Sequence, residues 1–335
     1  MPIRIGTSYS RESSPVEAAK AAAERALSKA GCHQSNTVIF FATSEHRGHY
    51  AEMADVIRKI AGAENVAGSS GYGILTDETE IEKQPGVSVM VIDSANAPAS
   101  SFLLSDLQEN NFRAGEKIAG WYGKLPRQTS PLLIFPDPFS FQSHLFFDGF
   151  EQALTHVPMI GGLSSENGKE SKAHQMASGR VSHDAVAGLA FGEDFRIETG
   201  IARSCQPFGE PLRITKAAGN MIYEMEGRPA YDMLLESMAQ IESEHPEHLM
   251  QRIFLGVPIR SFQTDFQSSP YLIRNIMGVN AKKGMLSCLS PVQEGEFVTF
   301  AIQDPAYSRR HMEEMLEDLR YRILPDKPAF GFYFN

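Results

Sequence analysis

The chain has 335 residues, which is long enough for two domains of average size. It carries 31 Lys and Arg against 41 Asp and Glu, and the net charge of −10 disfavours nucleic acid and anionic membranes as partners, because both are polyanions. There is no apolar run of roughly 18 residues that would form a membrane helix, no secretory signal at the start, and too few cysteines for a disulfide scaffold. These features predict a soluble protein of the reduced cytoplasm.

The first part of the chain predicts alternating helices and strands. Ser14 and Pro15 are typical of a helix N-terminus, and Gly31 is suited to end the same helix. A continuous apolar run follows at residues 37–42, and an amphipathic helix then extends through Ile60. Continuous apolar runs are typical of strands that are covered on both faces, so we expect a parallel strand–helix–strand unit here.

A second stretch of the chain repeats this order at nearly the same spacing. The first copy reaches a Gly/Ser segment at residues 66–73, and the second copy runs from a strand at 131–136 to a Gly/Ser segment at 161–168. Each segment is followed by a run typical of a buried strand, at 87–92 and at 185–191. The repeat predicts a duplicated unit of strand, helix, strand and Gly/Ser loop.

Near residue 195 the pattern changes from strand–helix alternation to consecutive short strands. Further helices are expected to begin at Ala230 and at Pro305. The change predicts two domains, residues 1–192 and 193–335. The fold class we expect is α/β, with mixed β-sheets flanked by helices in both domains.

The two Gly/Ser segments are the most distinctive candidate sites. Glycine permits close approach to the backbone, and loop N–H groups with serine hydroxyls suit a carboxylate or a phosphate. Tight turns are the alternative, but ligands of α/β sheets bind at strand ends, so we expect a shared cleft. Neither segment matches a dinucleotide or phosphate-loop fingerprint. The candidate ligand-binding residues are Gly68, Ser69, Ser70, Gly71, Tyr72, Phe139, Phe141, Gly161, Gly162, Ser164, Ser165 and Asn220.

Nucleophilic chemistry has little support in the sequence. Residues 67–71 are a degenerate relative of the nucleophile elbow, with Ala67 in place of the first glycine and no helix directly after the serines. Cys288 lies in an apolar, strand-like context that is typical of an inert buried thiol. We therefore expect no enzyme activity, and a hydrolase that uses Ser70 or Cys288 is an alternative.

The histidines do not have the spacing of a zinc site. Two close pairs begin at His46 and at His245, and solvated polar turns explain both. His174 and His183 flank a polar stretch after the second Gly/Ser segment, where each is either an ordinary loop histidine or a proximal ligand of haem iron. We expect no cofactor, with haem as the alternative.

Three segments of the chain resemble the FIST family. They are residues 68–73, residues 160–165 and, most specifically, residues 211–230, which contain a Thr-x-Ala-x-Gly-Asn strand and a Glu-x-Glu-Gly-x-Pro-Ala turn. The family pairs an N-terminal with a C-terminal FIST domain, and the resemblance covers nearly the whole chain. It implies an intracellular sensory module of signal transduction that binds small ligands such as amino acids. One branch of the family binds haem and senses nitric oxide, and another is joined to an F-box in ubiquitin-ligase adaptors.

The chain departs from the family pattern at residues 328–335, an apolar run that predicts a strand. In similar proteins this strand continues into a Cys-x-x-Arg-Gly segment and further elements. A strand of such hydrophobicity needs covering, so we expect the C-terminal domain to be incomplete.

Taken together, these features predict a cytoplasmic, non-enzymatic sensory module that binds an amino acid or a small carboxylate in a cleft between the Gly/Ser segments. We expect it to signal through a separate partner such as a kinase or a cyclase, and to have no nucleic acid and no membrane as partners. The alternatives are a haem-binding nitric oxide sensor, a protein–protein adaptor, and a Ser- or Cys-dependent hydrolase.

Overall fold

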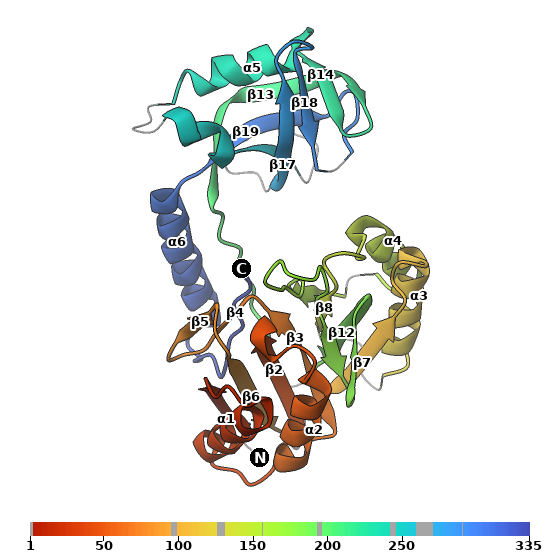
Figure 1. Ribbon diagram of the computed structural model, residues 1–335, viewed down its shortest axis with the longest axis vertical. Helices are drawn as coiled ribbons and strands as arrows, with labels where there is room; N and C mark the ends of the chain where they lie inside the picture. Colours follow the sequence, from red (N-terminus) through yellow and green to blue (C-terminus); the bar gives the residue numbers. More distant parts are fainter. Residues whose placement is uncertain are drawn as a thin grey trace. The chain divides into compact units, whose positions relative to one another are not determined.

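The computed structural model of the chain is a mixed α/β structure with two compact units, so the predicted α/β class and two-part organisation are confirmed (Figure 1). The first unit consists of Met1–Ile197 and Pro328–Asn335, and the second of Glu198–Lys327. The chain therefore passes from one unit to the other a few residues beyond the predicted domain limit. The structure describes residues 3–94, 99–125, 131–155, 157–192, 196–241, 246–258, 271–289 and 291–335.

The first unit contains two successive sets of strands and helices. The first set is β1 (Arg4–Ser10), α1 (Pro15–Ala30), β2 (Thr37–Thr43), the short 3-10 helix η1 (Ser44–His46), α2 (Tyr50–Ala61), β3 (Asn65–Gly71), β4 (Gly73–Leu75), β5 (Glu80–Glu82) and β6 (Val87–Asp93). The second set is β7 (Ser100–Ser105), α3 (Asn111–Tyr122), β8 (Leu132–Pro136), α4 (Ser143–Ala153), β9 (Met159–Gly161), β10 (Gln175–Ala177), β11 (Arg180–Ser182) and β12 (Ala185–Ala190).

The two sets form two sheets with corresponding strand orders. The first sheet has the order β1-β6-β2-β3-β10-β11, and the second has the order β7-β12-β8-β9. In each sheet one strand pair is parallel, β2 with β3 and β8 with β9, and a helix connects its two strands. The first four strands of the first sheet thus have the same connectivity as the second sheet, while the duplication itself stays a prediction. The hairpin β10–β11 of the second set extends the first sheet, because β10 pairs with β3.

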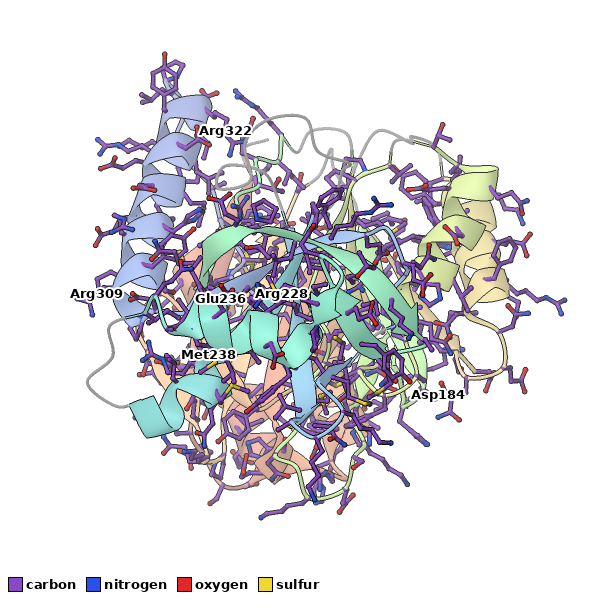
Figure 2. All side chains as sticks on the ribbon, turned by 90° about the horizontal axis from the view of Figure 1, so that it is seen from above. Asp184, Arg228, Glu236, Met238, Arg309 and Arg322 are labelled. Atoms are coloured by element: carbon purple, nitrogen blue, oxygen red, sulfur yellow. The ribbon has the colours of Figure 1, made fainter. Side chains whose placement is uncertain are left out.

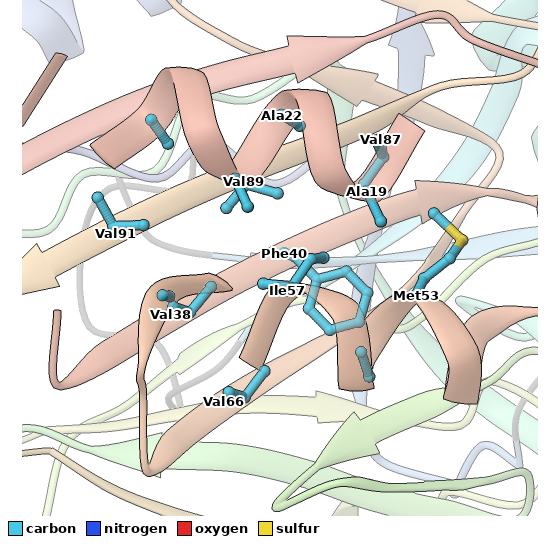
Figure 3. Close-up of a cluster of buried hydrophobic side chains, with 14 of the residues drawn as sticks. Ala19, Ala22, Val38, Phe40, Met53, Ile57, Val66, Val87, Val89 and Val91 are labelled. Carbon is cyan, nitrogen blue, oxygen red and sulfur yellow. The ribbon is translucent and has the colours of Figure 1, made fainter. Parts of the chain in front are cut away.

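Side chains that alternate along the strands divide the first unit into layers. Helices α1 and α2 cover the outer face of the first sheet, where Phe40 and Ile57 share a core (Figure 3). Ile39, the neighbour of Phe40, lies instead in a core with Leu133 of the second sheet. Helices α3 and α4 cover the outer face of that second sheet. The order of layers is therefore helices, sheet, sheet, helices, and we call the central core the inter-sheet core.

Parts of the two Gly/Ser segments belong to strands, where we expected loops. Gly68, which we expected in a loop, lies inside β3, and a Cβ atom there would come 1.8 Å from the carbonyl oxygen of Phe40. Gly161 has φ +146°, and its Cβ would come 1.9 Å from the carbonyl oxygen of Ile134. Both glycines are required because the neighbouring backbone leaves no room for a side chain.

The second unit is built on a closed antiparallel barrel. Strands β13, β19, β16, β17, β18 and β14 are neighbours in this order, and pairing of β13 with β14 closes the ring. Its elements are β13 (Cys205–Ala218), β14 (Met221–Met225), β15 (Arg228–Pro229), α5 (Ala230–Met238), η2 (Pro246–Arg252), β16 (Ile253–Pro258), β17 (Tyr271–Asn280), β18 (Met285–Cys288), β19 (Phe297–Gln303) and α6 (Pro305–Ile323).

Helix starts in the second unit lie where the sequence predicts them. Helix α5 begins at Ala230 and contributes Leu234 to the barrel core, while Glu236 on its exposed side pairs with Arg228 at 2.8 Å (Figure 2). Helix α6 begins at Pro305, and the Asp304 carboxylate accepts hydrogen bonds from the first free N–H groups.

The end of the chain differs from its prediction. Residues 328–335 form no strand, and they group with the first unit rather than the second. The half-buried rings of Phe330, Phe332 and Phe334 pack against the inter-sheet core. The apolar pattern at the terminus therefore reflects burial between sheets and not strand pairing. Within the described residues, no helix has both the length and the apolar character needed to cross a membrane.

We predict that Gly68→Ala destabilises the first unit by roughly 3 kcal/mol, because the new methyl group overlaps the Phe40 carbonyl oxygen. Gly120→Ala is the matched control, since Gly120 is helical with open space around it, and it should stabilise the protein by about 1 kcal/mol. Urea denaturation measures both changes. Equal stability of the Gly68→Ala variant and the parent would contradict the assigned strand contact.

Candidate functional site

The two Gly/Ser segments meet in the first unit, and Ser70 lies at their contact. Its hydroxyl donates to the carbonyl oxygen of Ser165 and accepts from the N–H of His174, both at 2.9 Å. The backbone N–H of Ser70 donates to the His174 carbonyl oxygen, and its carbonyl oxygen accepts from the N–H of Ser165. We call this region, residues 68–73 with residues 161–175 and the neighbouring residues 44–50, the loop junction.

The same contacts occupy most of the groups that we expected to hold a ligand. The N–H of Tyr72 donates to the Ser165 hydroxyl at 2.8 Å, and the N–H of Ser164 donates to the Pro136 carbonyl oxygen at 2.9 Å. Backbone donors of the junction are thus largely engaged within the protein. The unpaired groups that the structure shows at the junction are side-chain atoms.

The other predicted residues are spread over several surroundings. Gly162 lies beside the ring of Phe334, and Tyr72 is partly exposed. Phe139 is 51% exposed, whereas Phe141 packs on Phe146 in the core that α3 and α4 cover.

Asn220 belongs to the second unit. Its side-chain amide donates to the Cys288 carbonyl oxygen at 3.0 Å and stabilises the turn between β13 and β14. Its role in ligand binding, like that of the other predicted residues, stays a prediction.

Arg47, from the first set of strands and helices, binds residues of a loop from the second set. Its Nη2 atom lies 3.2 Å from the Glu166 carboxylate and 3.3 Å from the Asn167 side-chain oxygen, and its Nη1 atom lies 3.1 Å from Glu170. The side chains of Arg47 and Glu166 are only 18% and 8% exposed, so this ion pair is well shielded from water. Sequence reasoning missed Arg47, because its partners are 119 or more positions away.

Unpaired buried polar atoms concentrate at the loop junction. In the part of the chain that the structure describes, the buried side-chain nitrogen and oxygen atoms without a hydrogen-bond partner are His46 Nδ1 and Nε2, Arg47 Nε, Ser164 Oγ, His174 Nδ1, and Gln175 Oε1 and Nε2. An unpaired buried polar group costs about 1–3 kcal/mol, so such groups are rare and need an explanation. Bound water or a bound ligand supplies one.

Two of these residues are neutral histidines. His46 is only 1% exposed, and burial lowers its pKa; the interpretation as a solvated turn was wrong for this residue. Its neighbour His49 is exposed and faces Glu52, whereas the pair beginning at His245 lies outside the described residues. Burial, together with the charge of His183, also lowers the pKa of His174. At neutral pH each imidazole therefore offers one donor and one acceptor.

Aromatic rings hold His174 in place. Its ring centroid lies 5.1 Å from that of Tyr50, which begins α2, and 6.3 Å from that of the exposed His183. His174 and His183 are the two histidines that we considered as ligands of haem iron. Among the described residues, no group of three or more His, Cys, Asp or Glu side chains is arranged to hold a metal ion.

Neither candidate nucleophile has an activating base among the hydrogen bonds of the described residues. The Ser70 hydroxyl donates its proton to a carbonyl oxygen, whereas an activated serine donates to a base. Cys288 is fully buried, and burial raises the pKa of its thiol to about 11. Burial also raises the pKa of the Cys32 and Cys205 thiols.

Known protein families match both parts of the chain. The FIST N domain matches residues 36–228, and the FIST C domain matches residues 230–335. The chain belongs to the FIST family. FIST domains are sensory domains of signal transduction, and the loop junction lies in the FIST N domain.

Similar proteins come from distant organisms. An uncharacterised protein of Mycobacterium tuberculosis H37Rv is 22% identical over 334 residues, which cover 99% of this chain and 85% of the relative. An uncharacterised protein of Methanocaldococcus jannaschii is 25% identical over 66% of this chain and 44% of its own length. A crystal structure of cyanuric acid hydrolase from A. caulinodans covers 58% of this chain and 71% of its own at 12% identity. Its TM-score is 0.31, which is too low to support an argument about function.

We predict that Ser70→Ala destabilises the protein by about 1–3 kcal/mol, because it leaves the His174 N–H and the Ser165 carbonyl oxygen without their partner. Ser28→Ala, on the exposed face of α1, is the control and should change stability by less than about 0.5 kcal/mol. Thermal or urea unfolding measures both. A stability effect no larger than that of Ser28→Ala would show that Ser70 does not join the two segments.

We also predict that the thiols react slowly in the folded protein. Cys32, Cys205 and Cys288 are buried, and their raised pKa values leave little thiolate at pH 8. Iodoacetamide labelling followed by mass spectrometry should modify all three only after denaturation. Rapid modification of native Cys288 would instead favour the cysteine-dependent alternative.

Proposed function

We propose that the FIST N domain binds a small polar molecule, an amino acid or a small carboxylate, at the loop junction, and that the protein is a cytoplasmic sensor without enzyme activity. The observation that carries this proposal is the gathering of unpaired, buried polar atoms at one place, on His46, Ser164, His174 and Gln175. A ligand that pairs with these atoms removes their desolvation penalty and therefore stabilises the folded state.

The charged groups of the junction support a ligand with both signs of charge. Arg47 Nε is an unpaired donor for a carboxylate, and Glu170 is a carboxylate that an ammonium group can approach from solvent. A free amino acid carries both groups. A simple carboxylate can pair only with Arg47 Nε, because the other Arg47 nitrogens already hold Glu166 and Glu170. It has no ammonium group to pair with Glu170.

We propose that the ligand-bound protein signals through a separate partner such as a kinase or a cyclase.

Haem is the second candidate ligand, since a neutral imidazole with an unpaired nitrogen, as on His174, is the group that haem iron binds. In the second unit the exposed side chains of Leu272 and Met277 on β17 favour the adaptor alternative.

We predict that at least one free amino acid raises the melting temperature of the full chain in a thermal-shift screen that also contains small carboxylates and haem. A ligand that binds only the native state stabilises it by about 2.7 kcal/mol at a hundred times its dissociation constant. A Soret band after haem addition would replace the amino-acid proposal with the haem alternative. Absence of any shift and any Soret band would reject small-ligand sensing at this junction.

His46→Leu separates binding from folding. Because the variant removes two unpaired buried nitrogen atoms, its melting temperature without ligand should equal or exceed that of the parent, while the ligand-induced shift should fall or disappear. His49→Leu is the matched control, since His49 is exposed, and it should keep the full shift. A full shift in His46→Leu would place the ligand elsewhere.

A further inference from the structure

Polar side chains enter the inter-sheet core at the edge where the loop junction lies. Ser69 on β3 and Gln175 on β10 are directly opposite each other in the antiparallel register. Two positions further along, Ala67 and Ala177 are also opposite, and both belong to the inter-sheet core. Because side chains two positions apart share a face, Ser69 and Gln175 face the second sheet. They are 5% and 0% exposed.

Gln175 is the most isolated polar side chain of this edge. Neither its amide oxygen nor its amide nitrogen has a partner, although the residue is completely buried. Ser164 approaches from the second sheet, where its N–H is bonded to Pro136 at the end of β8, and its hydroxyl is likewise buried and unpaired. The amide nitrogen and the amide oxygen of Gln175, which lie in one plane, are therefore at the same edge of the core as the unpaired Ser164 hydroxyl.

Aromatic rings border these polar groups. Phe41 is opposite Ser69 in the parallel register of β2 and β3, so its ring lies on the same face. It contacts Phe135 edge to face at 5.2 Å between centroids, and Phe135 is 6.3 Å from Phe334. Phe41 and Phe334 are only half-buried, which leaves this edge of the core in reach of solvent. Flat molecules pack well against such rings.

The charged groups described near this edge already have partners. Arg47 holds Glu166 and Glu170, and the buried Asp137 carboxylate, after β8, accepts hydrogen bonds from the N–H groups of Phe139 and Ser140. An ionised group placed between the sheets would lose its water without gaining an opposite charge, which is strongly unfavourable. An uncharged amide meets no such penalty, because its C=O and N–H can pair with the N–H and C=O of the Gln175 side chain.

We infer that Ser69, Ser164 and Gln175 form a subsite for an uncharged, flat, amide-bearing group, which Gln175 holds by two hydrogen bonds beside Phe41, Phe135 and Phe334. This inference rests on the proposed function and narrows its ligand. The charged end of the ligand stays at Arg47, and the end that enters between the sheets carries an amide or a cyclic amide and not a carboxylate.

Benzamide and benzoate test the subsite, because they differ only in the group that Gln175 would meet. Saturation-transfer NMR and calorimetry on the full chain should show that benzamide binds at least tenfold more tightly than benzoate. Gln175→Met keeps the side-chain length and removes both hydrogen bonds, so it should weaken benzamide at least tenfold. Gln206→Met, at an exposed position of β13, is the control and should leave benzamide binding unchanged.

Ser164→Ala is a second variant in case Gln175→Met does not fold, as judged by circular dichroism, and it should weaken benzamide at least threefold. Equal binding of benzoate, no binding of benzamide, or unchanged binding in the folded variants would overturn the subsite. If amino acids still raise the melting temperature while benzamide does not bind, this inference fails and the proposed function stands. If no amino acid binds either, both fail.

Discussion

The hydrogen bonds of Ser70 to Ser165 and His174 join the two sets of strands and helices of the first unit at the point where β10 pairs with β3. Once these bonds are made, β10 is aligned with β3, and the loop that carries Glu166 lies within reach of Arg47. The unpaired atoms of His174 and Gln175 follow from this alignment, since Gln175 begins the strand that Ser70 anchors and His174 directly precedes it. The arrangement of the candidate site is thus a consequence of how the two sheets are joined.

Local signals in the sequence were sufficient for much of the fold. Pro15, Gly31 and Asp304 mark helix ends because capping depends on a few neighbouring residues, and apolar runs identify β2 and β8 because both strands are covered on both faces. The candidate site was harder to predict from the sequence. Arg47 pairs with a residue 119 positions away, and the burial of His46 is a property of the folded chain, so no local pattern indicates either.

The Gly/Ser segments show how one residue pattern serves two purposes. Gly68 and Gly161 are required by neighbouring backbone, which is a packing reason, while the serines beside them bond the segments together. The sequence therefore indicated where the two sets of elements meet, although, apart from the Ser164 hydroxyl, the unpaired groups belong to residues outside the predicted set, on His46, Arg47, His174 and Gln175. A sensory domain can retain such costly groups, because stability that is withheld until a ligand arrives is what allows the ligand to change the protein.

The return of residues 328–335 to the first unit makes the second unit an insertion within the first in chain order. Phe330, Phe332 and Phe334 complete the inter-sheet core only after the whole barrel of the second unit has been translated. Until then the inter-sheet core lacks the rings of these three residues. The first unit is therefore synthesised in two parts, one before and one after the second unit, and the later part joins the core only after the second unit has been synthesised.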